Sequence, residues 1–484
     1  MRAESGANEA PTPNARPKFQ WLGPGVIMAA SGIGASDIIA ATVAGASCGL
    51  PLLWALALAA LCKYFLSEGI ARWQLATGLT AIEGWARYLP RFVLWAFAAY
   101  LVLWAAAVSG ALLGGCGLAI ENITGGVVLR TWGGLAHGVV AFALIWFAHG
   151  TVFSRVVKPL IVLMFVGIVA CAAITISDPL AILRGLLMPS IPAAGTTHVF
   201  SLIGGIGGSL TLLSYNYLLR DEGKVDANNL SVLRADLKIA YLFTAIFGLS
   251  VMLIAHRVFF VPGIAITDRD AVSRMAGQLA ELVGPAGFYI YSVGFWAAVL
   301  ASLFGVWQII PRVFADCYSL LRSFEIKERE AAMKTGSSQF RAALAFMALV
   351  SVPFVLADRP VLIVIAFTIL GSVFIPFVAA TLLYLNNRVT WRSTIPHNRY
   401  GTNTILIFVL LLFLLVTTWE VASLFGVQIE GTTAWLTSTN RTTGEFRGRV
   451  VDSEGAEIMV LTKSRTGWHI RAIHWSSHKI KPAK

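Results

Sequence analysis

The sequence has little charge. Only 13% of its 484 residues are Asp, Glu, Lys or Arg, whereas 57% are hydrophobic. A water-soluble domain of this size carries roughly 25% charged residues. Crossing the hydrocarbon layer of a bilayer takes roughly twenty residues. Several stretches of about this length contain no charge at all; they include 92–120, 159–176, 360–385 and 404–418. The scarcity of charge therefore excludes a soluble protein and predicts an all-α integral membrane protein.

Patterns typical of enzymes and of nucleic-acid-binding proteins are also missing. The five cysteines have no metal-ligand spacing. The sequence has no Walker A motif, no His-Glu-x-x-His, no paired catalytic carboxylates and no Cys/His cluster. The formal net charge of +12 comes from basic residues scattered over loops rather than from one basic patch. We therefore expect that the protein is not an enzyme and has no resident cofactor and no nucleic-acid partner. The expected partner that surrounds it is the lipid bilayer.

The apolar stretches predict a transmembrane core of about eleven helices over residues 21–427. Lys and Arg gather in alternate loops, and the positive-inside rule then places the N-terminus in the cytoplasm of a multi-pass protein of the cell (inner) membrane. Residues 1–20 are polar and rich in proline, and are expected to form a disordered cytoplasmic segment. Because the number of spans is odd, residues 428–484 are expected outside the cytoplasm.

This C-terminal tail differs in pattern from the core. Residues 444–451 and 458–462 are β-prone and flank Asp452-Ser-Glu-Gly455, which is a turn signal. Residues 467–475 alternate like a further strand. The pattern predicts a small extracytoplasmic β-meander.

Two spans carry glycine-rich interruptions. The first contains Ser31-Gly-Ile-Gly-Ala-Ser36, and the sixth contains the similar Gly204-Gly-Ile-Gly-Gly-Ser209. An offset of five spans is what an inverted repeat of five helices produces, and matched interruptions of this kind mark the midplane site of such transporters. The alternative is that these glycines only allow close helix packing. The break glycines are Gly32, Gly34, Gly205, Gly207 and Gly208.

Asp37 is the ionisable residue beside the first interruption. A charge in the middle of a span is costly and usually faces a cavity or a partner. Three roles are open: cation ligand, proton carrier, and cap of the following half-helix, whose N-terminal end favours a carboxylate. Further along, Glu68 and Arg72 are four residues apart and are predicted to form a structural ion pair. Hydroxyl groups that could add oxygen ligands, or only bond helix backbone, are those of Ser31, Ser36, Ser209, Thr211 and Ser214.

The chain resembles the NRAMP (natural resistance-associated macrophage protein) family of divalent-metal transporters at these same residues. The similar segments are Gly23-Pro-Gly-Val-Ile with Gly34-Ala-Ser-Asp37, the run 52–78, Ile182-Leu-Arg-Gly-Leu-Leu-Met-Pro189, and Gly205-Ile-Gly-Gly. The resemblance covers roughly residues 20–425. It implies a LeuT-type fold, with a five-plus-five inverted repeat and an eleventh helix.

The departures from the family pattern are concentrated at the site. The family's Asp-Pro-Gly-Asn is similar in place to Gly34-Ala35-Ser36-Asp37, and its Met-Pro-His to Leu212-Leu213-Ser214. The family's helix-ten glutamine corresponds to Thr368, and its acidic pair on helix three has no counterpart. By this resemblance Asp37 is the charged metal ligand, Ser31 and Ser209 are carbonyl donors, and the remaining residues expected to line the site are Gly34, Leu212, Ser214 and Thr368.

These changes bear on the predicted substrate. Methionine sulfur favours soft transition metals, and Leu212 removes it. One carboxylate with hydroxyls and carbonyls suits a hard cation such as Mg²⁺. We therefore expect a secondary transporter that moves a divalent cation by alternating access, Mg²⁺ rather than Mn²⁺ or Fe²⁺. One alternative keeps the fold but carries an organic solute or anion; another is a membrane receptor whose outer domain recognises a ligand. Proton coupling and oligomeric state stay open.

Overall fold

The computed structural model describes residues 23–147, 151–176, 178–192, 195–223, 225, 229–260, 271–357, 360–388, 398, 400–424, 427–430, 433–446, 449–464 and 467–479. The predicted N-terminal segment 1–20 lies outside the described residues. The helices of the core are α1 Pro24–Gly32, α2 Ala35–Cys48, α3 Leu53–Thr77, α4 Ala81–Tyr88, α5 Arg91–Ile123, α6 Arg130–Phe147, α7 Thr151–Thr175, α8 Pro179–Leu187, α9 Thr196–Gly205, α10 Ser214–Asp221, α11 Leu230–Phe259, α12 Ala271–Val283, α13 Pro285–Leu321, α14 Ile326–Met333, α15 Ser338–Leu356, α16 Pro360–Leu385 and α17 Tyr400–Leu424, with 3-10 turns η1 Leu50–Leu52 and η2 Leu210–Leu213.

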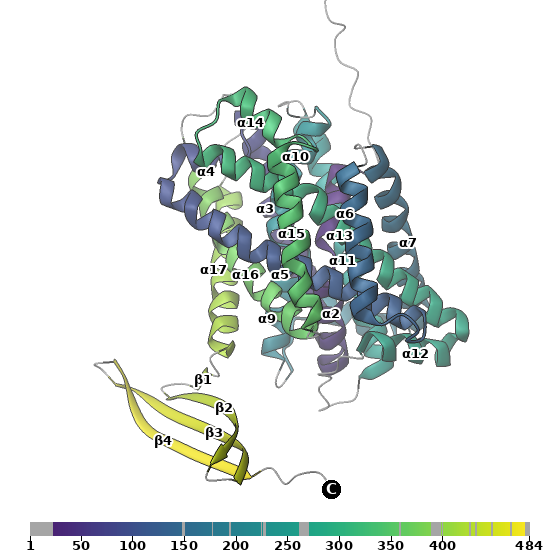
Figure 1. Ribbon diagram of the computed structural model, residues 1–484, viewed down its shortest axis with the longest axis vertical. Helices are drawn as coiled ribbons and strands as arrows, with labels where there is room; N and C mark the ends of the chain where they lie inside the picture. Colours follow the sequence, from purple (N-terminus) through teal and green to yellow (C-terminus); the bar gives the residue numbers. More distant parts are fainter. Residues whose placement is uncertain are drawn as a thin grey trace, which may run out of the picture.

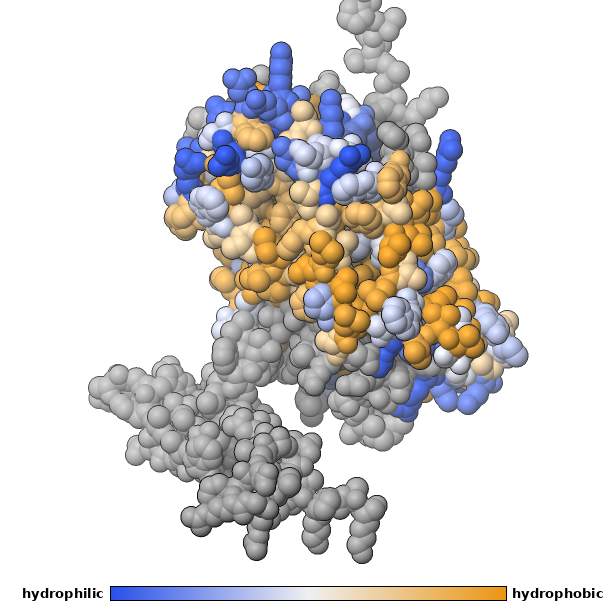
Figure 2. Space-filling view, in the orientation of Figure 1, coloured by the Kyte–Doolittle hydropathy of each residue, from blue (hydrophilic) through white to orange (hydrophobic). Residues whose placement is uncertain are grey.

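The described elements of the core are all helices, which confirms the predicted all-α membrane fold. Among the described residues, eight helices are long and apolar enough to cross a membrane, or nine if the bent pair formed by α1 and α2 counts as one span. Figure 2 shows apolar side chains across the middle of the bundle and hydrophilic ones toward both of its ends, most of them at the upper end. Large apolar side chains are exposed on the helices, among them Trp95, Val139 and Leu349, as expected for a surface in contact with lipid tails.

The centre of the bundle is built from the interrupted helices and their neighbours. α1 packs against α11 and α13, and α13 also packs against α5 and α7. α11 also packs against α2 and α3. It therefore contacts both halves of the first interrupted helix, α1 and α2. Proline at the first position begins α1 and α13, where its missing N–H removes no helical hydrogen bond. Each of the four half-helices (α1, α2, α9 and α10) therefore packs against at least one long continuous helix.

One end of the bundle carries a buried ionic cluster at α4, α10, α13 and α14 (Figure 1). Arg329 Nε lies 2.6 Å from the Asp316 carboxylate, and Arg329 Nη2 contacts the Glu83 carboxylate. Arg220 also contacts Glu83, at 2.6 Å. The Tyr217 hydroxyl donates to Asp316 at 2.7 Å. Burial lowers the pKa of the Arg329 guanidinium to about 10, so it is still charged at neutral pH. The cluster therefore ties the end of α10 to three other helices.

A second ionic group confirms the predicted pairing of Glu68 with Arg72. The Arg72 guanidinium lies 3.2 Å from the Glu68 carboxylate, one helical turn away on α3. Arg234 of α11 adds two hydrogen bonds to the same carboxylate, at 2.7 and 3.0 Å. The predicted pair is thus part of a three-residue group that joins α3 to α11.

The chain leaves α17 at the end of the bundle opposite to the ionic cluster and enters four strands (Figure 1). They are β1 Val427–Glu430, β2 Thr433–Phe446, β3 Arg449–Ser464 and β4 Gly467–Lys479, paired antiparallel in sequence order. The predicted turn at Asp452–Gly455 is wrong. These residues lie within β3, where Asp452 pairs with Thr443 and Gly455 with Asn440. The pairing with β2 continues through all four residues and holds the backbone extended, so no turn forms there.

Candidate functional site

The two glycine-rich interruptions lie in the middle of the bundle. α1 ends at Gly32, and α2 begins at Ala35 with its axis turned by 61°. α9 ends at Gly205, and the chain passes through Gly207 and Gly208 before η2 begins. Both of these glycines have left-handed φ angles, +79° and +69°, which residues with a Cβ rarely adopt. Glycine is therefore what allows the second interruption.

The backbones of the two interruptions touch. A Cβ added at Gly32 would lie 3.2 Å from the carbonyl group of Gly207 and from the Cα of Gly208. One added at Gly208 would lie 2.9 Å from the Gly32 Cα and closer still to the Thr211 hydroxyl. The absence of side chains at these positions lets the interrupted helices cross with their main chains in contact.

Asp37 joins the two interruptions by hydrogen bonds. Its Oδ2 accepts the Gly34 N–H at 3.0 Å, which caps the start of α2, and its Oδ1 accepts the Gly207 N–H at 2.6 Å. Its side chain is buried, with 2% of the residue exposed. Of the three roles left open by the sequence, the cap is the one that these hydrogen bonds show. The roles of cation ligand and proton carrier stay predictions.

Lys63 of α3 reaches the same place from the opposite side. Its Nζ donates to the carbonyl oxygen of Gly204 at 3.3 Å and to that of Ile206. These carbonyls end α9, where the helix dipole is negative. The ammonium also interacts electrostatically with the Asp37 carboxylate. Lys63 was not predicted as a site residue from the sequence. The signal that marks it is a lysine inside an apolar span, which requires a buried partner.

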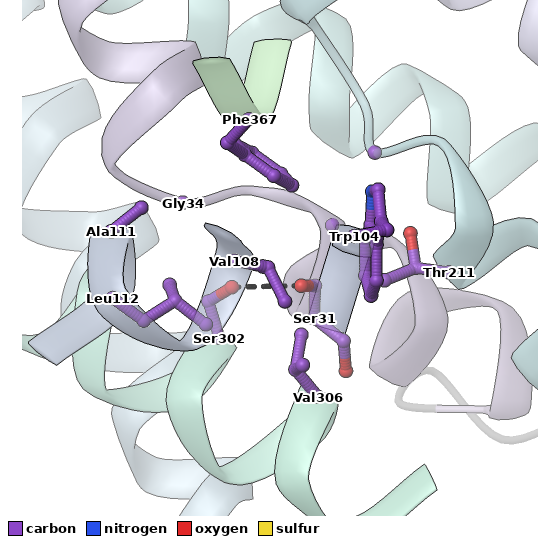
Figure 3. A pocket seen from close by; sticks show the side chains of 12 residues that line it. Ser31, Gly34, Trp104, Val108, Ala111, Leu112, Thr211, Ser302, Val306 and Phe367 are labelled. Carbon is purple, nitrogen blue, oxygen red and sulfur yellow. Dashed lines mark hydrogen bonds between the residues drawn. The ribbon is translucent and has the colours of Figure 1, made fainter. Parts of the chain in front are cut away.

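A small cavity lies beside the interruptions, between them and α5, α13 and α16 (Figure 3). Its volume of about 10 Å³ is room for a single water-sized body. The Ser302 hydroxyl points to Ser31 and donates to its carbonyl at 2.8 Å. The lining residues described by the structure include no Cys, Met, His, Asp or Glu; they are Ser31, Gly32, Gly34, Trp104, Val108, Ala111, Leu112, Gly208, Thr211, Ser302, Val306 and Phe367.

The predicted site residues divide into two groups. Ser31 and Gly34 line the cavity. Ser209, Leu212 and Ser214 are buried nearby but do not line it. The Ser209 hydroxyl accepts the indole N–H of Trp104 at 3.1 Å, and that of Ser214 donates to the Thr211 carbonyl. The side chain of Thr368 lies outside the described residues.

Seven residues of the cavity were not predicted from the sequence; they are Trp104, Val108, Ala111 and Leu112 of α5, Ser302 and Val306 of α13, and Phe367 of α16. They come from continuous helices that carry no motif, so only the packing of those helices brings them here. Among the described residues, no group of three or more His, Cys, Asp or Glu is placed to bind a metal ion. A cation in this cavity would therefore take carbonyl and hydroxyl oxygens; Asp37, the predicted charged ligand, is not among the lining residues.

Comparison with known proteins gives consistent results. The family model described as "Natural resistance-associated macrophage protein-like" matches residues 25–426. The chain is 24% identical over 297 residues to the divalent metal cation transporter MntH of Bacillus subtilis (strain 168), covering 58% of this chain and 67% of that protein. It is 25% identical over 297 residues to MntH of Klebsiella pneumoniae (strain 342), covering 59% and 69%.

Solved structures share the fold at low sequence identity. A mutant of the Eremococcus coleocola manganese transporter superposes with a TM-score of 0.66 at 14% identity, over 86% of this chain and 91% of that one. MhsT in complex with L-phenylalanine superposes with a TM-score of 0.50 at 14% identity, over 83% of this chain and 100% of that one. The fold predicted for the core is thus that of its structural neighbours.

Proposed function

The chain belongs to the natural resistance-associated macrophage protein (Nramp) family, and we propose on this premise that it carries a divalent metal cation across the membrane. It is a transporter and not an enzyme, as the family is. The observation that carries the proposal is the direct contact of the two interrupted helices, joined by Asp37 through the Gly34 and Gly207 amides. In transporters with paired interruptions, such a crossing is where substrate binds and the half-helices move.

A pair of hydrogen bonds to one carboxylate links two of the half-helices, α1 and α10. Asp236 of α11 accepts the Gly25 N–H in the first turn of α1 at 2.8 Å, and the Tyr215 hydroxyl of α10 at 2.9 Å. A carboxylate at the start of α1 is also favoured by the helix dipole. α1 and α10 are therefore linked through one buried side chain. We expect them to move together when the site opens toward their end of the bundle.

We further propose that the substrate is a hard cation, Mg²⁺ in preference to Mn²⁺ or Fe²⁺. The support is the kind of donor at the interruptions, which is oxygen. Ser31, Thr211 and Ser302 line the cavity with carbonyl and hydroxyl groups, and the Asp37 carboxylate, which is not part of the lining, joins the two interruptions. Oxygen suits hard cations, whereas soft metals gain from sulfur. The related proteins bear names that refer to divalent metals and manganese, so the preference for Mg²⁺ rests on the residues of this chain.

A small organic solute is the second candidate. Two observations favour it: the largely apolar lining of the cavity, with Trp104, Val108 and Phe367, and the Lys63 ammonium near Asp37. Apolar lining with a few polar groups is typical of sites for organic ligands.

Uptake into proteoliposomes tests the proposal. Liposomes containing the protein are expected to take up Mg²⁺ faster than protein-free liposomes, and Mn²⁺ more slowly than Mg²⁺. Uptake of Mn²⁺ with no uptake of Mg²⁺ would contradict the preference for a hard cation. Absence of any divalent uptake, together with thermal stabilisation by an amino acid or a carboxylate, would replace the proposal by the second candidate.

We also propose that the ionic end of the bundle faces the cytoplasm and that the sheet of β1–β4 lies outside. The support is that the basic residues of α10, α13 and α14 gather at one end, as the positive-inside rule requires, whereas α17 leads into β1 at the other (Figure 1). On this layout residues 21–427 form the transport core and residues 428–484 form a separate outer unit.

A further inference from the structure

Lys63 has surroundings unlike those of an ordinary lysine. The residue is fully buried, and its ammonium donates to two carbonyl oxygens, those of Gly204 and Ile206. A buried ammonium is costly unless hydrogen bonds and opposite charge replace the water that it loses. Here the carbonyls that end α9 supply the hydrogen bonds and the negative end of a helix dipole, and Asp37 supplies the opposite charge.

The contacts of Lys63 and Asp37 meet on a single peptide group. The Ile206 carbonyl accepts from Lys63, and the Gly207 N–H of the same peptide donates to Asp37. The C=O and N–H of a trans peptide point in opposite directions. The positive and negative side chains therefore lie at the two ends of one peptide dipole, each at the end of opposite sign.

The stem of Lys63 has a defined place as well. The space where a Cβ of Gly207 would project is bordered by Lys63 Cδ, the Thr244 methyl group and the Tyr241 ring, at 3.3, 3.4 and 3.9 Å. The Tyr241 hydroxyl is itself hydrogen-bonded to Ser67 at 2.7 Å. A side chain at position 207 would therefore meet the lysine stem. The glycine, which the left-handed backbone already requires, also makes room for it.

Carbonyls released at the end of an interrupted helix are the kind of oxygen donor that binds small cations in transporters with this architecture. In this chain an ammonium stands among them. We infer that Lys63 is a built-in cation: its ammonium occupies the cation position made by the Gly204 and Ile206 carbonyls. The interruption is thereby stabilised without a bound accessory ion, and a cation substrate meets a fixed positive charge near Asp37. The second consequence rests on the proposed function; the first does not.

The first consequence is tested on the purified full chain by thermal unfolding. Lys63→Met keeps most of the stem and removes the ammonium, which leaves the carbonyls without a positive partner. Wild type and variant are compared in choline chloride, NaCl and MgCl₂ at equal ionic strength. The variant is expected to unfold at a lower temperature than wild type in choline chloride, and to recover by roughly 3 °C or more in Na⁺ or Mg²⁺. Wild type is expected to respond equally to choline chloride and NaCl. Any stabilisation of wild type by MgCl₂ is that of a bound substrate, so only the additional response of the variant is counted.

Matched variants make the result specific. Lys63→Arg keeps a positive charge and is expected to respond to NaCl and MgCl₂ as wild type does. Lys327→Met removes one charge from an exposed position on α14 and controls for net charge. If Lys63→Met does not fold, Lys63→Gln, which can still donate to a carbonyl, takes its place. A neutral variant as stable as wild type in choline chloride and indifferent to the cation would overturn the inference.

The second consequence is measured by uptake. Lys63→Met is expected to lower the KM for Mg²⁺ several-fold, because it removes a positive charge near the substrate; an unchanged or raised KM would contradict it. If no variant transports a divalent cation, the proposed function fails, whereas the unfolding result still decides whether Lys63 fills a cation position. The two failures are therefore distinguishable.

The double variant Asp37→Asn/Lys63→Met is expected to lose most of the stabilisation by cations, because both charges at the peptide are gone.

Discussion

Asp37 and Gly207 are joined across the two interrupted helices by a hydrogen bond of 2.6 Å, although they lie 170 residues apart in the chain. The amide of one helix interruption is thus satisfied by the carboxylate that caps the other. A hydrogen bond to a charged acceptor in a buried place is worth more than a neutral one at a surface. The contact makes Asp37 both a structural and a candidate ligand residue, and experiments on it must separate the two.

Asp37→Asn is the direct test of that residue. Asparagine keeps one acceptor oxygen and places an amide donor where the second oxygen was, so either the Gly34 or the Gly207 N–H loses its partner. We expect a loss of stability of about 1–3 kcal/mol and loss of Mg²⁺ uptake in proteoliposomes. Asp178→Asn is the control, because Asp178 caps α8 at an exposed position. Undiminished uptake by folded Asp37→Asn protein would remove Asp37 from the transport site.

Gly208→Ala tests the contact between the interrupted helices. The substitution costs about 1–2 kcal/mol for the left-handed backbone alone, and the new methyl group would also meet Thr211 and the Gly32 backbone. Gly78→Ala is a matched control: its φ of +73° is close to the +69° of Gly208, but a Cβ there meets nothing within 4 Å. We expect Gly78→Ala to be mildly destabilised and active, and Gly208→Ala to lose uptake. Equal behaviour of both variants would show that backbone strain, and not the helix contact, is what matters.

Arg329→Gln tests the ionic cluster at the end of α10. Arg329 contacts the buried carboxylates of Asp316 and Glu83. Removing one partner of a buried charge group typically costs about 3–5 kcal/mol, because the remaining charge loses its partner. Arg312→Gln is the comparison, since its partner Asp221 is 51% exposed and such a pair is worth about 0–1 kcal/mol. Chemical unfolding of both variants is the measurement; a loss at Arg329 no larger than at Arg312 would contradict a stabilising cluster.

Single introduced cysteines test the proposed orientation. The five native cysteines are all buried, so a membrane-impermeant maleimide applied to intact cells is expected to leave them unmodified. A cysteine at Ser477 of β4 is expected to react from outside, and one at Lys327 of α14 only after the membrane is permeabilised. The reverse pattern would place the sheet in the cytoplasm.

Much of this protein followed from local sequence. The charge-free stretches predicted the helical membrane core, and the two glycine-rich interruptions pointed to the segments that meet at its centre, because apolar length and the freedom of glycine act within one segment. The Glu68–Arg72 pair is likewise one turn of a single helix. Local reasoning was wrong at Asp452–Gly455, where turn-forming residues lie inside β3 because pairing with β2 decides their conformation.

What only the tertiary structure decided is which partners the buried charges have outside their own helix. Lys63 and Gly204 are 141 residues apart, and nothing near either one in the chain indicates their hydrogen bond. The same is true of Trp104, Ser302 and Phe367, which reach the cavity from helices without a motif. A buried charge needs a partner of opposite sign or a set of hydrogen bonds, and the sequence by itself determined that such partners exist. Which ones they are depends on how helices distant in the chain pack together, and this packing placed an ammonium beside the carboxylate at the centre of the bundle.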